Sequence, residues 1–107
     1  MIYFDNGATT FPKPREVTEA VRQAMTRYGA NPGRSGHDLS IQTSNKVYQS
    51  REAAATLFGV DDPSEVVFTS NCTHAINTAL KGLLRPGDHV ILSDLEHNAV
   101  LRPIHTL

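Results

Sequence analysis

Four small polar residues separate an apolar run from a segment with helical spacing: Ser70, Asn71, Cys72 and Thr73. The apolar run predicts a strand, and the segment after it predicts an amphipathic helix. Backbone N–H groups at a helix start lack intrahelical partners, and the helix dipole adds about half a positive charge there. Such a start suits a bound phosphate. The alternative is a plain helix cap, which this junction alone favours, because Ser, Thr and Asn are preferred N-cap residues.

A second polar pair, Glu96 and His97, follows the next apolar run. Imidazole is planar and exchanges protons near neutral pH, so His97 could stack on an aromatic ligand and move a proton. The alternative is an ordinary hydrogen-bonded loop histidine. Ligands of open α/β sheets gather where the strands end, so we expect both polar clusters to lie near one ligand.

The elements that would position these clusters alternate between strand and helix. Residues 65–70 and 89–94 predict strands with uninterrupted apolar centres, whereas residues 72–84 and the segment from Asn98 onward predict helices. Such strands are typical of parallel sheets that are buried on both faces. The alternation predicts an α/β fold. Two strands cannot bury one another on both faces, so we expect this chain to be the N-terminal portion of a longer protein.

The first part of the chain predicts a different arrangement. Residues 1–14 predict an extended arm, because an Asn-Gly turn and two prolines interrupt regular structure. Helical spacing covers residues 15–28 and 39–59, and a glycine-rich loop joins these two predicted helices. We therefore divide the chain into residues 1–38, with the arm, first helix and loop, and residues 39–107, which begin an α/β domain.

Composition narrows the function. The 107 residues carry a formal net charge of −1 with no long run of one sign, which argues against nucleic acid as a partner. No apolar run is long enough to cross a membrane, and the first residues do not form a signal peptide. A single cysteine, Cys72, fits a reducing, cytoplasmic compartment. The histidines lack metal-ligand spacing, so we expect no metal site.

Several motifs together resemble one family. The segments "YFDNGATT", "NPGRSGH", "FTSNCTHAIN" and "EHNAVLRP" occur in the order found in the N-terminal part of cysteine desulfurases. These enzymes belong to the class V aminotransferase group and depend on pyridoxal 5'-phosphate. The resemblance implies the start of a large domain like that of aspartate aminotransferase. It also implies a homodimer that converts L-cysteine to L-alanine and passes sulfur, as an enzyme persulfide, to a sulfur-acceptor protein.

The resemblance also implies roles for particular residues. Cys72 and Thr73 would bind the cofactor phosphate, and His97 would be catalytic, stacking on the cofactor ring and assisting proton transfer. Glu96 would either orient His97 or be solvated. Candidates for a cross-subunit or pocket role are Arg34, His37, Asn6, Ala8 and Thr9, although the loop that carries Arg34 and His37 could equally be a plain linker.

Some features depart from the family pattern or are missing. Many relatives have Gly then Ala or Thr at Asn71 and Cys72, and His74 replaces a frequent Glu. Cys72 does not match the persulfide-forming cysteine, which lies far downstream in the family. No lysine follows a Ser-x-His sequence, so we expect the chain to be inactive by itself. A selenocysteine lyase, a small-amino-acid aminotransferase and a non-enzymatic binding or scaffold domain remain alternatives.

Overall fold

A computed structural model describes residues 2–7, 9–34 and 36–106 of the chain. Ala8, one of the residues singled out above, lies outside the described residues. The chain divides into two compact units, Met1–Val66 and Val67–Leu107, which are described separately. The division expected at residues 38 and 39 stays a prediction.

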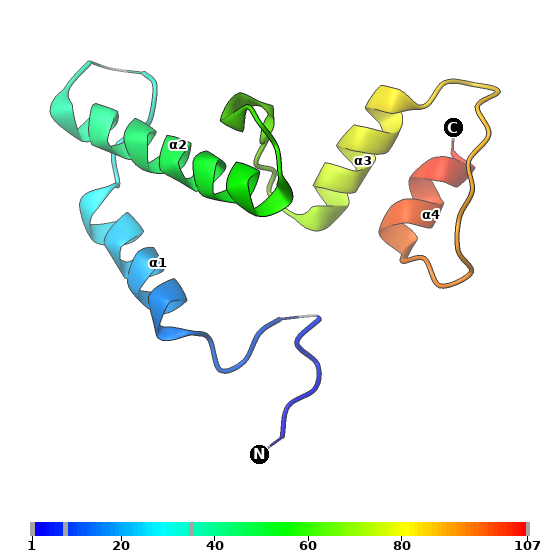
Figure 1. The fold of residues 1–107 in the computed structure, drawn as a ribbon, viewed down its shortest axis with the longest axis horizontal. Coiled ribbons are helices and arrows are strands. Elements are labelled where there is room, and N and C mark those ends of the chain that lie inside the picture. Colours follow the sequence, from blue (N-terminus) through cyan, green and yellow to red (C-terminus); the bar gives the residue numbers. More distant parts are fainter. Residues whose placement is uncertain (1, 8, 35, 107) are drawn as a thin grey trace. The chain divides into compact units, whose positions relative to one another are not determined.

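Two long helices dominate the first unit. They are α1 (Arg15–Arg27) and α2 (Asp38–Phe58), and a short 3-10 turn, η1 (Pro63–Glu65), contacts α2 (Figure 1). Both helices match the predicted ranges to within one residue at each end. Gly59 ends α2 in the left-handed conformation, with φ of 68°, which glycine adopts at little cost.

An exposed ion pair stabilises α1 locally. Arg22 donates to Glu19 at 2.7 Å, one turn along the helix. This contact, helped by Gln23, lowers the pKa of Glu19 from 4.5 to about 2. The carboxylate is therefore ionised at every pH near neutrality, and its exposure to water keeps the pair weak.

The second unit contains α3 (Cys72–Leu83) and α4 (Asn98–His105), which pack against each other (Figure 1). Both helices were predicted. The buried residues of this unit, among those that the structure describes, are Ala99 and Pro103 of α4. None of the helices among residues 2–7, 9–34 and 36–106 combines the length and apolar character that a membrane crossing requires.

The predicted α/β fold is wrong for this structure. Residues 65–70 and 89–94 form no strand, and within the described ranges the regular structure is entirely helical. A strand exists only while its backbone is hydrogen-bonded to a neighbouring strand, and neither segment has one. Their apolar side chains are correspondingly open to solvent: Phe68 is 54% exposed and Ile91 is 88% exposed. An apolar run therefore indicates that its side chains favour burial, but it does not show that a neighbouring strand is present to pair with its backbone.

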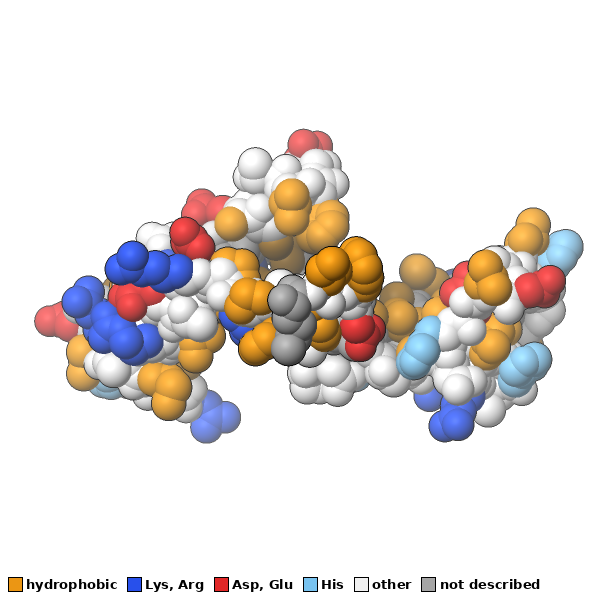
Figure 2. Space-filling model, turned by 90° about the horizontal axis from the view of Figure 1, so that it is seen from below, with side chains coloured by type: hydrophobic (Ala, Val, Ile, Leu, Met, Phe, Trp, Pro, Cys, Tyr) orange, Lys and Arg blue, Asp and Glu red, His pale blue; other side chains and the backbone are white. Residues whose placement is uncertain are grey.

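Apolar surface is plentiful on both units. Figure 2 shows apolar side chains on the surface of each. The exposed large apolar residues include Phe4, Val21, Met25, Leu57, Phe58, Val67, Leu83 and Leu95.

Candidate functional site

The start of α3 combines a helix cap with unused donors. Asn71 is the N-cap residue, and its Oδ1 accepts the backbone N–H of His74 at 2.8 Å. Its carbonyl accepts the N–H of Ala75 at 3.1 Å. The backbone N–H groups of Cys72 and Thr73 have no acceptor within the described part of the chain. Asn71 is therefore a true N-cap residue, and the backbone N–H groups of Cys72 and Thr73 remain available to an anion.

Side-chain groups surround these two donors. The hydroxyl of Thr73 has no protein partner among the described residues, and the Cys72 thiol is exposed. Ser70 Oγ lies 3.2 Å from His74 Nδ1, a hydrogen bond whose direction depends on the histidine tautomer. His74, which departs from the family pattern, thus holds the serine hydroxyl beside the helix start.

His97 is the N-cap of α4. Its Nδ1 accepts the backbone N–H of Ala99 at 3.1 Å. An acceptor nitrogen carries no proton, so the neutral ring carries its proton on Nε2. While this cap bond is intact, Nδ1 cannot take up a proton, and Nε2–H can only donate a hydrogen bond.

Glu96 does not hold the imidazole of His97 in this structure. Its Oε1 accepts a hydrogen bond from Ser93 Oγ at 2.9 Å. Of the two roles considered for Glu96, orientation of His97 finds no support here. The cap bond to Ala99 orients the ring instead.

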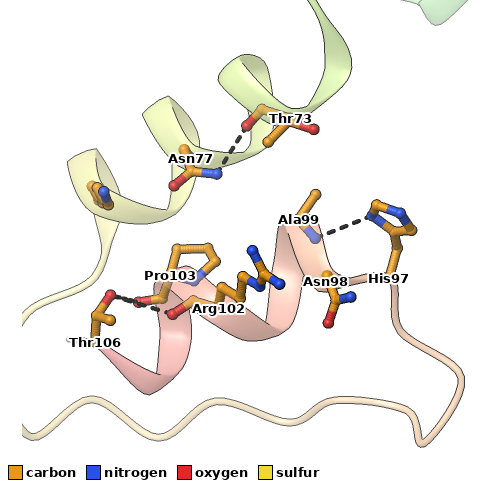
Figure 3. Close-up of a pocket in the computed structure, with 9 residues that line it drawn as sticks. Thr73, Asn77, His97, Asn98, Ala99, Arg102, Pro103 and Thr106 are labelled. Atoms are coloured by element: carbon orange, nitrogen blue, oxygen red, sulfur yellow. Dashed lines mark hydrogen bonds between the residues drawn. The ribbon is translucent and has the colours of Figure 1, made fainter.

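A pocket of about 450 Å³ lies between α3 and α4 (Figure 3). Thr73 and His97 both line it, although they come from different helices and are 24 positions apart in the sequence. Ala99 and Pro103, both buried, form its apolar part. The complete lining is Thr73, Asn77, Lys81, His97, Asn98, Ala99, Arg102, Pro103 and Thr106.

Five polar lining residues were not anticipated from the sequence: Asn77, Lys81, Asn98, Arg102 and Thr106. A signal for them was present. Asn77 and Lys81 follow Thr73 at intervals of four, which places all three on one side of a helix. Spacing alone could not reveal that α4 faces this stripe. Cys72 is not among the lining residues, and the roles assigned to Cys72, Thr73 and His97 stay predictions.

The remaining candidate residues belong to the first unit. His37 caps α2, with Nδ1 accepting the N–H of Ser40 at 3.2 Å. Asn6 Oδ1 accepts the N–H of Phe11 at 3.4 Å. Thr9 Oγ1 accepts from the Lys13 ammonium at 3.0 Å, and Arg34 is exposed in the loop before α2. These contacts are local, so a pocket role for these residues stays a prediction.

Across the described residues, no three His, Cys, Asp or Glu side chains gather as metal ligands.

Comparison with known proteins identifies the family. Residues 2–107 match the family described as Aminotransferase class-V, which is essentially the whole chain. The chain belongs to the class V aminotransferase family. No solved structure matches it.

Curated relatives of this class V chain are cysteine desulfurases. A probable cysteine desulfurase of Borreliella burgdorferi is 36% identical over 96% of the chain and 25% of that protein. The cysteine desulfurase IscS of Photobacterium profundum is 40% identical over 99% of the chain and 27% of that protein. A mitochondrial cysteine desulfurase of Drosophila melanogaster is 38% identical over 94% and 22%. The chain thus spans about a quarter of the length of these relatives, and the resemblance to cysteine desulfurases is confirmed.

The cap of α3 gives a first prediction for this class V chain. Replacing Asn71 with Ala removes the acceptor of the His74 N–H, and we expect a loss of about 1 kcal/mol of unfolding free energy. Asn71→Ser retains an N-cap acceptor and should lose much less. Urea unfolding of the natural full-length protein measures both. Equal losses in the two variants would show that the cap bond contributes nothing.

Proposed function

We propose that the natural protein is a cysteine desulfurase that depends on pyridoxal 5'-phosphate. It converts L-cysteine to L-alanine and passes sulfur, as an enzyme persulfide, to a sulfur-acceptor protein. We further propose a cytoplasmic homodimer. The similarity to several cysteine desulfurases over nearly the whole chain supports the assignment. The observation that carries it is the pair of unused N–H groups at the start of α3, beside a pocket shared by Thr73 and His97.

The residues present fit the phosphate of pyridoxal 5'-phosphate. A phosphate needs several donors and a positive potential, and the N-terminus of a helix provides both. Here the donors would be the N–H groups of Cys72 and Thr73 together with the Thr73 hydroxyl, none of which has a protein partner among the described residues. The small Cys72 side chain leaves the backbone open to the anion.

His97 would act beside the cofactor ring. When bound, pyridoxal 5'-phosphate withdraws electrons from the α-carbon of an amino acid and so makes its proton easier to remove. The imidazole offers a flat face for stacking, and its Nε2–H is free to donate a hydrogen bond, because Nδ1 accepts from Ala99. Uptake of a proton would occur at Nδ1 and would require release of this cap bond.

Other parts of the reaction need groups that this chain does not supply. Lys13, Lys46 and Lys81 lack the Ser-x-His context of the family's cofactor lysine, and Cys72 sits at the phosphate site. We propose that the lysine and the persulfide cysteine lie in the remainder of the protein, and that the chain is inactive by itself. Arg34, His37, Asn6 and Thr9 are proposed to complete the site, the first two across the dimer.

The test is an assay of the natural full-length protein with L-cysteine. We expect tight binding of pyridoxal 5'-phosphate, seen as a new absorbance band, and formation of alanine plus sulfide without a keto acid. Alanine formation that requires a keto acid would instead indicate an aminotransferase. Faster turnover of selenocysteine than of cysteine would indicate a selenocysteine lyase, and absence of cofactor binding would indicate a non-enzymatic domain. Each of these three results contradicts the proposal.

A further inference from the structure

Two polar stripes face each other across the pocket in the second unit. On each helix the residues of the stripe are four positions apart, so they lie about 6 Å apart along the axis. Figure 3 shows the two helices and the side chains that line the pocket, with Arg102 on α4. The stripes are Thr73, Asn77 and Lys81 on α3, and Asn98 and Arg102 on α4 with its C-cap residue Thr106.

The charge of this pocket is one-sided. Lys81 and Arg102 are both cationic, and no acidic residue is found among the residues that line the pocket. Neither cation forms an ion pair within the described ranges. Two like charges in one pocket repel each other, and an anion bound between them would offset this repulsion by attracting both.

A simpler explanation accounts for only part of this arrangement. Both cations lie in the last turn of their helices, where positive charge favourably opposes the helix dipole. That effect does not require the two side chains to share one pocket. The amide of Asn77 donates to the carbonyl of Thr73 at 2.9 Å, and the hydroxyl of Thr106 donates to the carbonyl of Pro103 at 2.9 Å. These groups therefore satisfy their own helices and leave the two cations as the unpaired charges of the pocket within the described ranges. Side chains of a helix lean toward its N-terminus, which brings both cations back over the polar stripes.

We propose that Lys81 and Arg102 form a second anion-binding subsite in this pocket. Its ligand is a small molecule with a phosphoryl or carboxylate group, which Arg102 can bind with two parallel hydrogen bonds while Lys81 adds a point charge. Lys81 lies eight residues beyond Thr73, or about 12 Å along α3, so the subsite is separate from the start of that helix. The inference goes beyond the proposed function, because it would hold even if pyridoxal 5'-phosphate did not bind.

The test is calorimetric titration of the natural full-length protein with inorganic pyrophosphate and, separately, with malonate. Both titrations are made with pyridoxal 5'-phosphate in excess, so that a phosphate site at Thr73 is already filled. We expect one of the two probes to bind, and the tighter one identifies the anionic group. Lys81→Gln and Arg102→Gln should each weaken that binding about tenfold, as expected for loss of one charge-assisted hydrogen bond.

A matched control separates the subsite from general charge attraction. Arg85→Gln removes one positive charge from the same unit at a residue that does not line this pocket, and it should leave affinity within about twofold. Lys81→Arg keeps the point charge and should bind within a few-fold of the natural protein, which excludes misfolding as the cause. Arg102→Lys keeps the charge but loses the paired hydrogen bonds, so its affinity should lie between those of the natural protein and Arg102→Gln. Equal losses in the Arg85 and pocket variants, no binding of either probe, or displacement of the probe by pyridoxal 5'-phosphate would overturn the subsite. Cofactor absorbance, measured on the same samples, reports on the proposed function independently.

Discussion

Replacing Thr73 with Val should weaken the binding of pyridoxal 5'-phosphate by about tenfold to a hundredfold. Valine has nearly the same shape but lacks the hydroxyl, and a hydrogen bond to a charged group contributes about 1.5–3 kcal/mol. The backbone N–H groups of Cys72 and Thr73 remain, so binding should weaken without disappearing. Titration of the cofactor-free natural protein, followed by absorbance, measures the change.

Thr78 provides the matched control on the same helix. Its hydroxyl donates to the carbonyl of His74 at 2.9 Å, and it does not line the pocket. Thr78→Val therefore makes the same chemical change on α3 and should leave cofactor affinity within about twofold. If Thr73→Val binds the cofactor as tightly as Thr78→Val, the hydroxyl of Thr73 has no part in holding the phosphate.

Replacing His97 with Asn should reduce the formation of alanine from L-cysteine by about a hundredfold or more. General acid–base catalysis contributes about 10² to 10⁴ in rate, and asparagine can neither exchange a proton near neutral pH nor stack as an aromatic ring. Asparagine is also a preferred N-cap residue, so it can still accept the Ala99 N–H and preserve the start of α4. The measurement is the steady-state rate of the natural full-length protein.

Two comparisons make this result specific to His97. His105→Asn changes a histidine at the opposite end of α4, outside the pocket lining, and should leave the rate unchanged. Urea unfolding of His97→Asn should match the natural protein within about 0.5 kcal/mol, because the cap is kept. A His97→Asn enzyme that retains its full rate would remove His97 from the catalytic machinery.

The helices could be predicted from local information. Apolar spacing located α1 and α2 to within one residue at each end, and the cap considered for the polar junction before α3 is provided by Asn71. These signals act over one or two turns, so they do not depend on what the rest of the chain does. The predicted strands failed for the opposite reason. Their identity depends on a hydrogen-bonded neighbour, and the apolar run around Ile91 has none in this structure.

The candidate site was predictable only in part. Motif order pointed to Thr73 and His97, and similarity to cysteine desulfurases confirmed the family behind those motifs. The hydrogen-bond partners of the side chains could not be predicted from the sequence. Ala99, rather than Glu96, orients His97, because the backbone N–H of Ala99 donates to His97 Nδ1 whereas Glu96 Oε1 accepts from Ser93.

Residue types and their order were enough to establish the family, the polar start of α3 and the helical segments. The pairing of α3 with α4 needed the folded chain, since it brings Thr73, Arg102 and their neighbours around one pocket across a stretch of irregular backbone. Local propensity acts within a few residues, whereas packing joins residues that are distant in sequence. The shared pocket of Lys81 and Arg102 is a consequence of that packing.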